Sequence, residues 1–120
     1  MTAPAPQGPE LFGWDCEQIG NWALHALTLY ADNDRPTLRV MLATARRLES
    51  EGHTLESRAR AFENYWLARC AVQFQNRMPN MRLADDNAAL QLVHMLRDLL
   101  GFVDWETVAE HYAAKLEAAR

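Results

Sequence analysis

The sequence predicts an all-α fold: a compact, single-domain bundle of about five helices with a long, mostly buried third helix. Apolar residues recur at the i, i+3, i+4 spacing of an amphipathic helix in one segment after another. No segment alternates polar residues with apolar or β-branched ones, as a half-buried strand does. The 120 residues, of which 49% are hydrophobic, suffice for one core and one domain.

The N-terminal part of the chain predicts a tail followed by a helix. Residues 1–10 are rich in Pro and Ala and show no periodicity, so we expect a flexible tail ahead of a single helical domain over 11–120. Asp15 is a favourable N-cap for a first helix that runs to about Tyr30.

The second and third helices follow from their end signals. Asp34 is a favourable N-cap for the second helix, and Gly52 is placed to end it. Thr54 begins the third and longest helix, which we expect to reach about Met78 because Pro79 disfavours helical geometry in the residue before it.

The middle of the third helix is apolar on almost every side between Tyr65 and Phe74, which predicts burial by several neighbours. Tyr65 and Trp66 are adjacent and therefore point about 100° apart on a helix. This favours a packing role over a platform for stacking nucleic-acid bases. Arg69 is the exception in this segment, and we expect it to extend outward or to pair with a carboxylate.

The last two helices also carry recognisable ends. Asp85 or Asp86 caps the fourth helix, and Gly101 closes it. Asp104 caps the fifth, whose apolar positions again follow helical spacing.

The net charge of −4 conceals an uneven distribution along the chain. Residues 1–34 hold five acidic groups and neither Lys nor Arg, and 83–120 hold seven acidic groups against three basic ones. Residues 35–82 hold nine arginines against four glutamates. We expect these segments to neutralise one another in the fold; the alternative is a basic face for an acidic partner.

The residues that carry enzymatic and metal chemistry are not arranged in recognisable motifs. The four His and two Cys show no metal-ligand spacing, and the chain has no phosphate-binding glycine loop or nucleophile elbow. Cys16 and Cys70 are expected to be reduced thiols of a cytoplasmic protein. No apolar run approaches the roughly 20 residues of a membrane span. We therefore expect a protein that is not an enzyme and uses no cofactor, metal or membrane.

The leading hypothesis is a small protein-binding module, an adaptor, regulator or inhibitor of bacterial, phage or other mobile-element origin. Its partner is another protein or a second copy of the chain, as in a homodimer. Acidic residues near the ends mimic nucleic-acid charge in this hypothesis, and partly exposed aromatics add apolar contact. The candidate residues are Trp14, Trp105, Asp32, Asp34, Asp85 and Asp86.

The alternative hypothesis is nucleic-acid binding, in which arginines of the second helix and of the 77–82 loop contact phosphates. Net acidity and the presence of a single Lys count against it. The candidate residues are Arg35, Arg39, Arg46, Arg47, Arg77 and Arg82.

Overall fold

The computed structural model describes residues 13, 15–77 and 87–120, and the regular elements in these ranges are all α-helices. The predicted all-α class with five helices is thereby confirmed for the described residues. The tail over 1–10 and most of the 77–82 loop lie outside them. The helices are α1 (Cys16–Asn33), α2 (Arg35–Ser50), α3 (Leu55–Arg77), α4 (Asn87–Leu100) and α5 (Trp105–Ala118).

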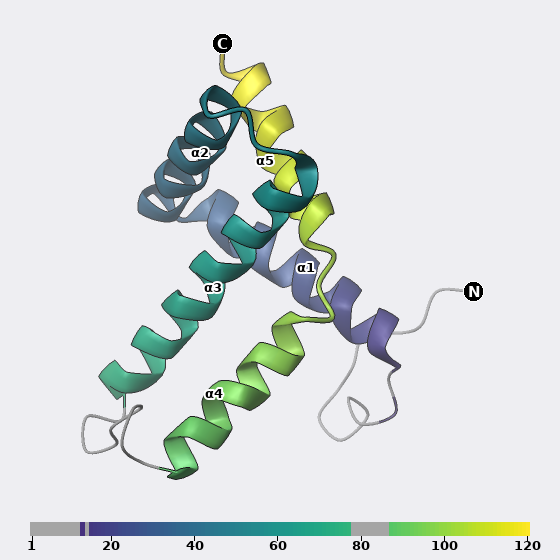
Figure 1. The fold of residues 1–120 in the computed structure, drawn as a ribbon, viewed down its shortest axis with the longest axis vertical. Helices are drawn as coiled ribbons and strands as arrows, with labels where there is room; N and C mark the ends of the chain where they lie inside the picture. The colour runs from purple at the N-terminus through teal and green to yellow at the C-terminus, as the bar shows by residue number, and fades with distance from the viewer. Residues whose placement is uncertain (1–12, 14, 78–86) are drawn as a thin grey trace.

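The helices divide into a closely packed part and a more open part (Figure 1). At the top of the view, α2, α5 and the first half of α3 lie together, and α3 packs most extensively against α5. α1 crosses the molecule and contacts α2 and α4. α4 runs beside the second half of α3, at the bottom of the view, and packs only against α3 and α1 to any extent.

The predicted N-caps at Asp15, Asp34 and Asp104 are confirmed, and the predicted cap of the fourth helix lies outside the described residues. Asp15 and Gln18 form a capping box, in which each side chain bonds to the backbone N–H of the other. Asp34 accepts a hydrogen bond from the backbone N–H of Thr37, and Asp104 caps α5 in the same way. Each carboxylate satisfies a backbone N–H that has no partner inside its helix.

The turn from α2 to α3 depends on a glycine. Gly52 has a φ of 72°, the left-handed region that side chains disfavour. This conformation lets the N–H of Gly52 donate to the carbonyl of Glu49 and the N–H of His53 donate to that of Leu48. The pair of bonds is a Schellman motif, which ends the helix at the residues that the sequence predicts.

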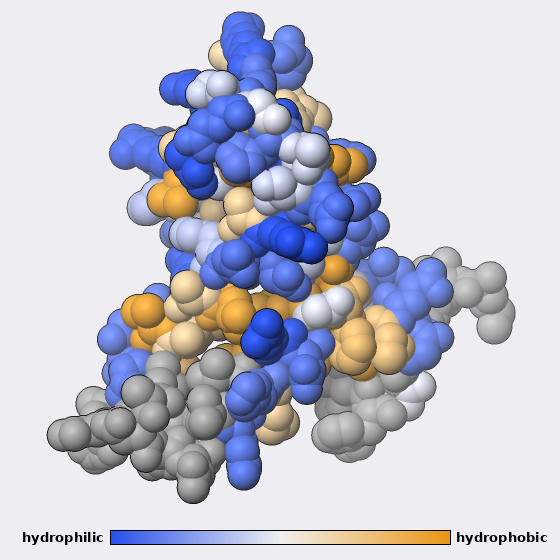
Figure 2. Space-filling view, viewed as in Figure 1, coloured by the Kyte–Doolittle hydropathy of each residue, from blue (hydrophilic) through white to orange (hydrophobic). Residues whose placement is uncertain are grey.

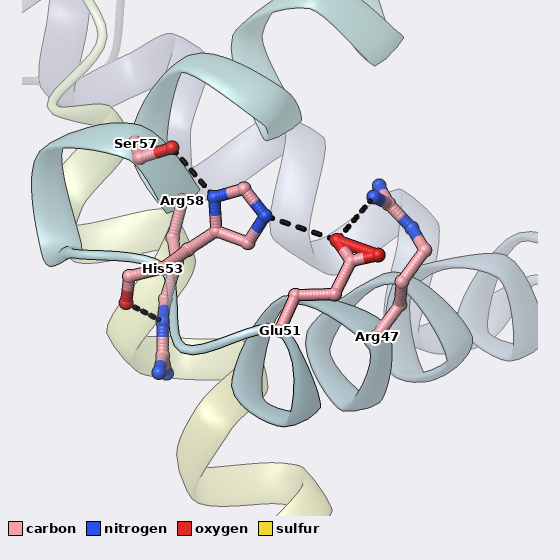
Figure 3. Close-up of polar contacts among 5 residues, drawn as sticks. All are labelled: Arg47, Glu51, His53, Ser57 and Arg58. Atoms are coloured by element: carbon pink, nitrogen blue, oxygen red, sulfur yellow. Dashed lines mark hydrogen bonds and ion pairs between the residues drawn. The ribbon is translucent and has the colours of Figure 1, made fainter.

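Side chains reinforce the same turn (Figure 3). The ring of His53 lies 2.8 Å from Ser57 Oγ and 3.0 Å from Glu51 Oε1, and Arg47 donates to that same carboxylate. Arg58 Nε donates to the carbonyl of His53. The hydrogen bond from His53, with the charge of Arg47, holds the pKa of Glu51 below its usual value.

The core lies mainly in the closely packed upper part of Figure 1 and is built mainly by α2, α3 and α5. Phe62 and Tyr112 stack with their ring centroids 5.7 Å apart, and both side chains are fully buried. Met41, Leu48 and Leu116 are also fully buried. Among the described side chains, α4 contributes none that is buried.

The prediction of a mostly buried third helix is not confirmed. Ala59, Phe62 and Trp66 are buried, but Val72 is 57% exposed and Ala68 is also exposed. The sequence pattern indicates an apolar circumference, yet among the described elements α4 is the helix that runs beside the second half of α3. Side chains that face away from α4, such as Val72, are therefore exposed.

A glycine marks the closest approach between α1 and the α4–α5 turn. Gly20 is buried, and a Cβ at this position would lie 2.0 Å from the carbonyl oxygen of Phe102. The two backbones therefore meet without an intervening side chain. Val103, in this turn, and Trp105, just after it, are buried in the core.

Candidate functional site

Arg69 occupies the centre of the most distinctive polar arrangement in the described structure. Its Nη1 donates to Thr37 Oγ1 over 2.6 Å and to Tyr65 Oη over 3.2 Å. Its Nη2 donates to Tyr30 Oη over 2.9 Å. Residues from α1, α2 and α3 thus meet on one guanidinium, which answers how the apolar segment accommodates a charge.

Aromatic rings complete the surroundings of Arg69. The guanidinium carbon lies 5.2 Å from the ring centroid of Tyr30 and 5.3 Å from that of Trp66, both within cation–π range. The Trp66 ring meets those of Tyr30 and Tyr65 edge to face. The Nε1 of Trp66 is buried and has no acceptor among the described residues.

The charge of Arg69 is not opposed directly. Its three hydrogen-bond acceptors are all neutral hydroxyl groups, and none of the described carboxylates forms an ion pair with it. The nearest link to an acid runs through Thr37, whose hydroxyl accepts from Arg69 and donates to Asp34. Of the two expected outcomes, pairing with a carboxylate is not found among the described residues, where hydroxyl groups and aromatic rings surround this charge instead.

A cleft of about 460 Å³ opens beside this arrangement, between α3 and its neighbours α1 and α4. Trp66, Phe74 and Leu96 form apolar walls, and Arg69 and Arg77 supply two positive charges. None of the described residues that line it is an Asp or a Glu. The volume suits one large side chain or a small organic molecule.

The thiol of Cys70 also lines the cleft. Burial raises its pKa, and the charge of Arg69 offsets only part of that effect. Because a thiol with a raised pKa is protonated at neutral pH, the cleft offers no activated nucleophile.

A second cleft, of about 540 Å³, lies between α3 and α4 near the α4–α5 turn. Here Glu63 and Asp98 accompany Arg97, so charges of both signs are present. The two clefts therefore differ, since the charged residues described in the cleft beside Arg69 are both arginines.

The open part of the molecule displays large apolar side chains. Figure 2 shows hydrophobic side chains in a band across the middle of the view, over the second half of α3 and toward α1, while the surface over α2 and α5 is mostly hydrophilic. We give the name apolar face to the large exposed apolar residues of α1, α4 and the second half of α3. They are Trp22, Leu29 and Tyr30 on α1, Val72 on α3, and Met95 and Leu99 on α4.

The residues that the sequence predicts to bind a partner protein are not all exposed, and some lie outside the described residues. Trp105 is buried, and its Nε1 donates to the carbonyl of Leu100 over 2.7 Å. The expectation of a partly exposed ring is wrong, because the N-cap at Asp104 turns the first residue of α5 into the core. Trp14, Asp85 and Asp86 lie outside the described residues.

The two described acids of that set act within the fold. Asp34 caps α2, and Asp32 joins α1 to α5 through His111 Nε2 at 2.9 Å and Lys115 Nζ at 3.6 Å. The other oxygen of Asp32 and the hydroxyl of Tyr112 are buried without hydrogen-bond partners among the described residues. Burial raises the pKa of Tyr112, and the carboxylate of Asp32 adds to this rise.

The arginines of the alternative hypothesis separate into groups. Arg35, Arg39 and Arg46 are exposed and lie within about 40° of one another around α2. None of the three pairs with a carboxylate of the described residues. Arg47 pairs with Glu51 instead. Of the two candidates near the loop, Arg77 lines the cationic cleft, and Arg82 lies outside the described residues.

Sequence reasoning identified Arg69 as anomalous but not the cleft beside it. The signal was a charge within an apolar stretch; its partners Thr37 and Tyr30 are distant in sequence, and no local pattern connects them. The apolar face was also missed, because its residues follow the same helical spacing that predicts a core.

No three His, Cys, Asp or Glu side chains of the described ranges gather as metal ligands do. None of the described helices combines the length and the apolar character needed to cross a membrane. No family model, curated protein or solved structure matches the chain.

Proposed function

We propose that this chain is a non-enzymatic protein-binding module of the adaptor, regulator or inhibitor kind, and that it binds a partner protein through the apolar face. The observation that carries the proposal is the exposure of large apolar side chains on neighbouring helices. Trp22 is 49% exposed, Leu29 55% and Met95 59%. Exposed large apolar side chains that lie together are typical of protein interfaces.

The character of α4 supports the same assignment. Its sequence carries a strong apolar stripe, yet Leu99 is 47% exposed and Leu96 and Leu100 are only half-buried. An amphipathic helix whose stripe its own fold covers incompletely buries that stripe against a partner.

The test compares partner recovery by matched variants. Met95→Gln with Leu99→Gln makes the apolar face polar, and Val40→Gln makes the same change at an exposed position on α2. We expect the parent chain and Val40→Gln to recover the same stoichiometric partner from cell extract and the double variant to lose it, with circular dichroism verifying that each folds.

Equal recovery by the double variant would overturn the assignment of the surface. Light scattering separates the two kinds of partner: a parent chain that dimerises, paired with a monomeric double variant, identifies the partner as a second copy.

Nucleic-acid binding is retained as a second candidate because three arginines that pair with no described carboxylate lie along one exposed face of α2. We propose that Arg35, Arg39 and Arg46 contact phosphates in that case. Replacing Arg39 and Arg46 with Gln is then expected to lower the slope of log affinity against log salt by about 2. The matched control is Arg60→Gln, an exposed arginine that already pairs with Glu56. An absence of duplex binding at low salt would eliminate this candidate.

A further inference from the structure

The donors of Arg69 are only partly used. A guanidinium has five N–H groups, and three of them donate to the hydroxyls of Thr37, Tyr65 and Tyr30. The other two have no acceptor among the described residues. Two available N–H groups on one planar cation match the two oxygens of a carboxylate.

The guanidinium is also held in place before any ligand arrives. Its hydrogen bonds reach three different helices, and the rings of Tyr30 and Trp66 flank it within cation–π distance. A donor that is already fixed loses little conformational freedom on binding, so more of each contact appears as affinity. Arginine suits this role better than lysine because its planar fork stacks on rings and bonds to two oxygens together.

The residues that line the cleft beside Arg69 indicate which chemical group the anionic ligand also carries. Trp66, Phe74 and Leu96 offer apolar and aromatic contact, and Arg77 adds a second positive charge. The described residues that line the cleft include two arginines and no acid, a balance that favours an anionic ligand. A ligand that satisfies both features carries a carboxylate beside a large apolar group.

We infer that this cleft binds a carboxylate attached to a large apolar group, with Arg69 on the carboxylate and the Trp66 and Phe74 rings against the apolar part. The inference rests on the proposed function in one respect, since it takes the group to be the C-terminal residue of a partner protein. Tyr30 belongs both to this cleft and to the apolar face, so a partner lying on the face reaches the cleft directly.

The first test uses two probes that differ only in charge, N-acetylphenylalanine and its neutral amide. Calorimetry is expected to show the acid binding at least about tenfold more tightly, because hydrogen bonds to charged groups are the stronger ones. Arg69→Lys retains the charge without the fork and should reduce acid binding to the level of the amide. Arg97→Gln, in the second cleft, should leave binding unchanged.

A second readout follows the thiol in the cleft. Saturating N-acetylphenylalanine should slow alkylation of Cys70 while leaving that of the exposed Cys16 unchanged. The amide at the same concentration should protect neither thiol. Circular dichroism of Arg69→Lys distinguishes loss of binding from loss of folding, and the parent protein's acid–amide comparison stands without any variant.

Several outcomes would overturn the inference. If the acid and the amide bind equally well, or if the acid does not slow alkylation of Cys70, the cleft is not a carboxylate site. Tighter binding of phenyl phosphate than of the acid assigns the cleft to phosphate. A peptide ending in phenylalanine should bind more tightly than the free probe; equal binding would assign the source to a small acid. The double variant Met95→Gln and Leu99→Gln separates the two proposals. If it loses the partner protein but binds N-acetylphenylalanine normally, the apolar face is needed for the partner and the cleft still binds its ligand.

Discussion

Gly20→Ala tests whether the contact between α1 and the α4–α5 turn is as close as the structure shows. In an ordinary exposed helix position, replacing Gly with Ala stabilises the fold by about 0.5–1 kcal/mol. At Gly20 the new Cβ would lie 2.0 Å from Phe102 O, whereas ordinary contacts begin at 3.4 Å. The backbones must separate by about 1.4 Å, the difference of those distances.

The expected effect is therefore a loss of stability. Inserting a methyl group into a packed site costs about 1–3 kcal/mol, which exceeds the gain in helix propensity and leaves a net loss of about 1–2 kcal/mol. Because the clashing atom belongs to the backbone, no side-chain rotation relieves it. Urea unfolding followed by circular dichroism should show a midpoint about 1 M lower, for an m-value of roughly 1.5 kcal/mol per molar.

Asn21→Ala is the matched control, at the next position of the same helix but exposed. It should be neutral or stabilising by up to about 0.5 kcal/mol through helix propensity alone. If Gly20→Ala proved as stable as the parent chain or more so, the close approach of the two backbones would be refuted.

The remaining predictions concern the core, a cap and pH. Phe62→Ala should lower the free energy of unfolding by about 3–5 kcal/mol, and Val72→Ala by no more than about 0.5 kcal/mol, in the same urea assay; equal losses would contradict the burial pattern of α3. Asp104→Ala should cost about 1 kcal/mol and lower the melting temperature by about 4 °C, measured by calorimetry. The raised pKa of Tyr112 means that the folded chain keeps this proton while the unfolded chain loses it above about pH 10. Stability should consequently fall as the pH rises past that value, and Tyr112→Phe should remove part of the fall while staying within about 1 kcal/mol of the parent at pH 7; identical pH profiles would count against this reasoning.

The helix ends were predictable because their signals are local. Asp15, Asp34 and Asp104 each satisfy a backbone N–H three residues away, and Gly52 supplies the left-handed backbone that ends α2. Such interactions depend on neighbours in sequence, so the sequence contains all the participants.

The burial of each helix face was less predictable because it depends on which helices meet. Apolar spacing in α3 indicates that its faces can be buried, but only packing decides whether a neighbour covers Val72. Trp105 illustrates the opposite error, since its place at the start of a helix suggested exposure and the turn before it directs the ring inward. The cationic cleft combines both difficulties: Arg69 is anomalous in the sequence, but its hydroxyl partners come from other helices.

The position of α4 has a consequence for how the molecule opens. Because no described side chain of α4 is buried in the core, detaching this helix leaves the stacked rings of Phe62 and Tyr112 intact. We therefore expect the α4 amides to exchange with solvent by local opening, while those of α2 and α5 exchange only on global unfolding. Local opening of α4 would expose the face of α3 that it covers, without loss of the α2, α3 and α5 core.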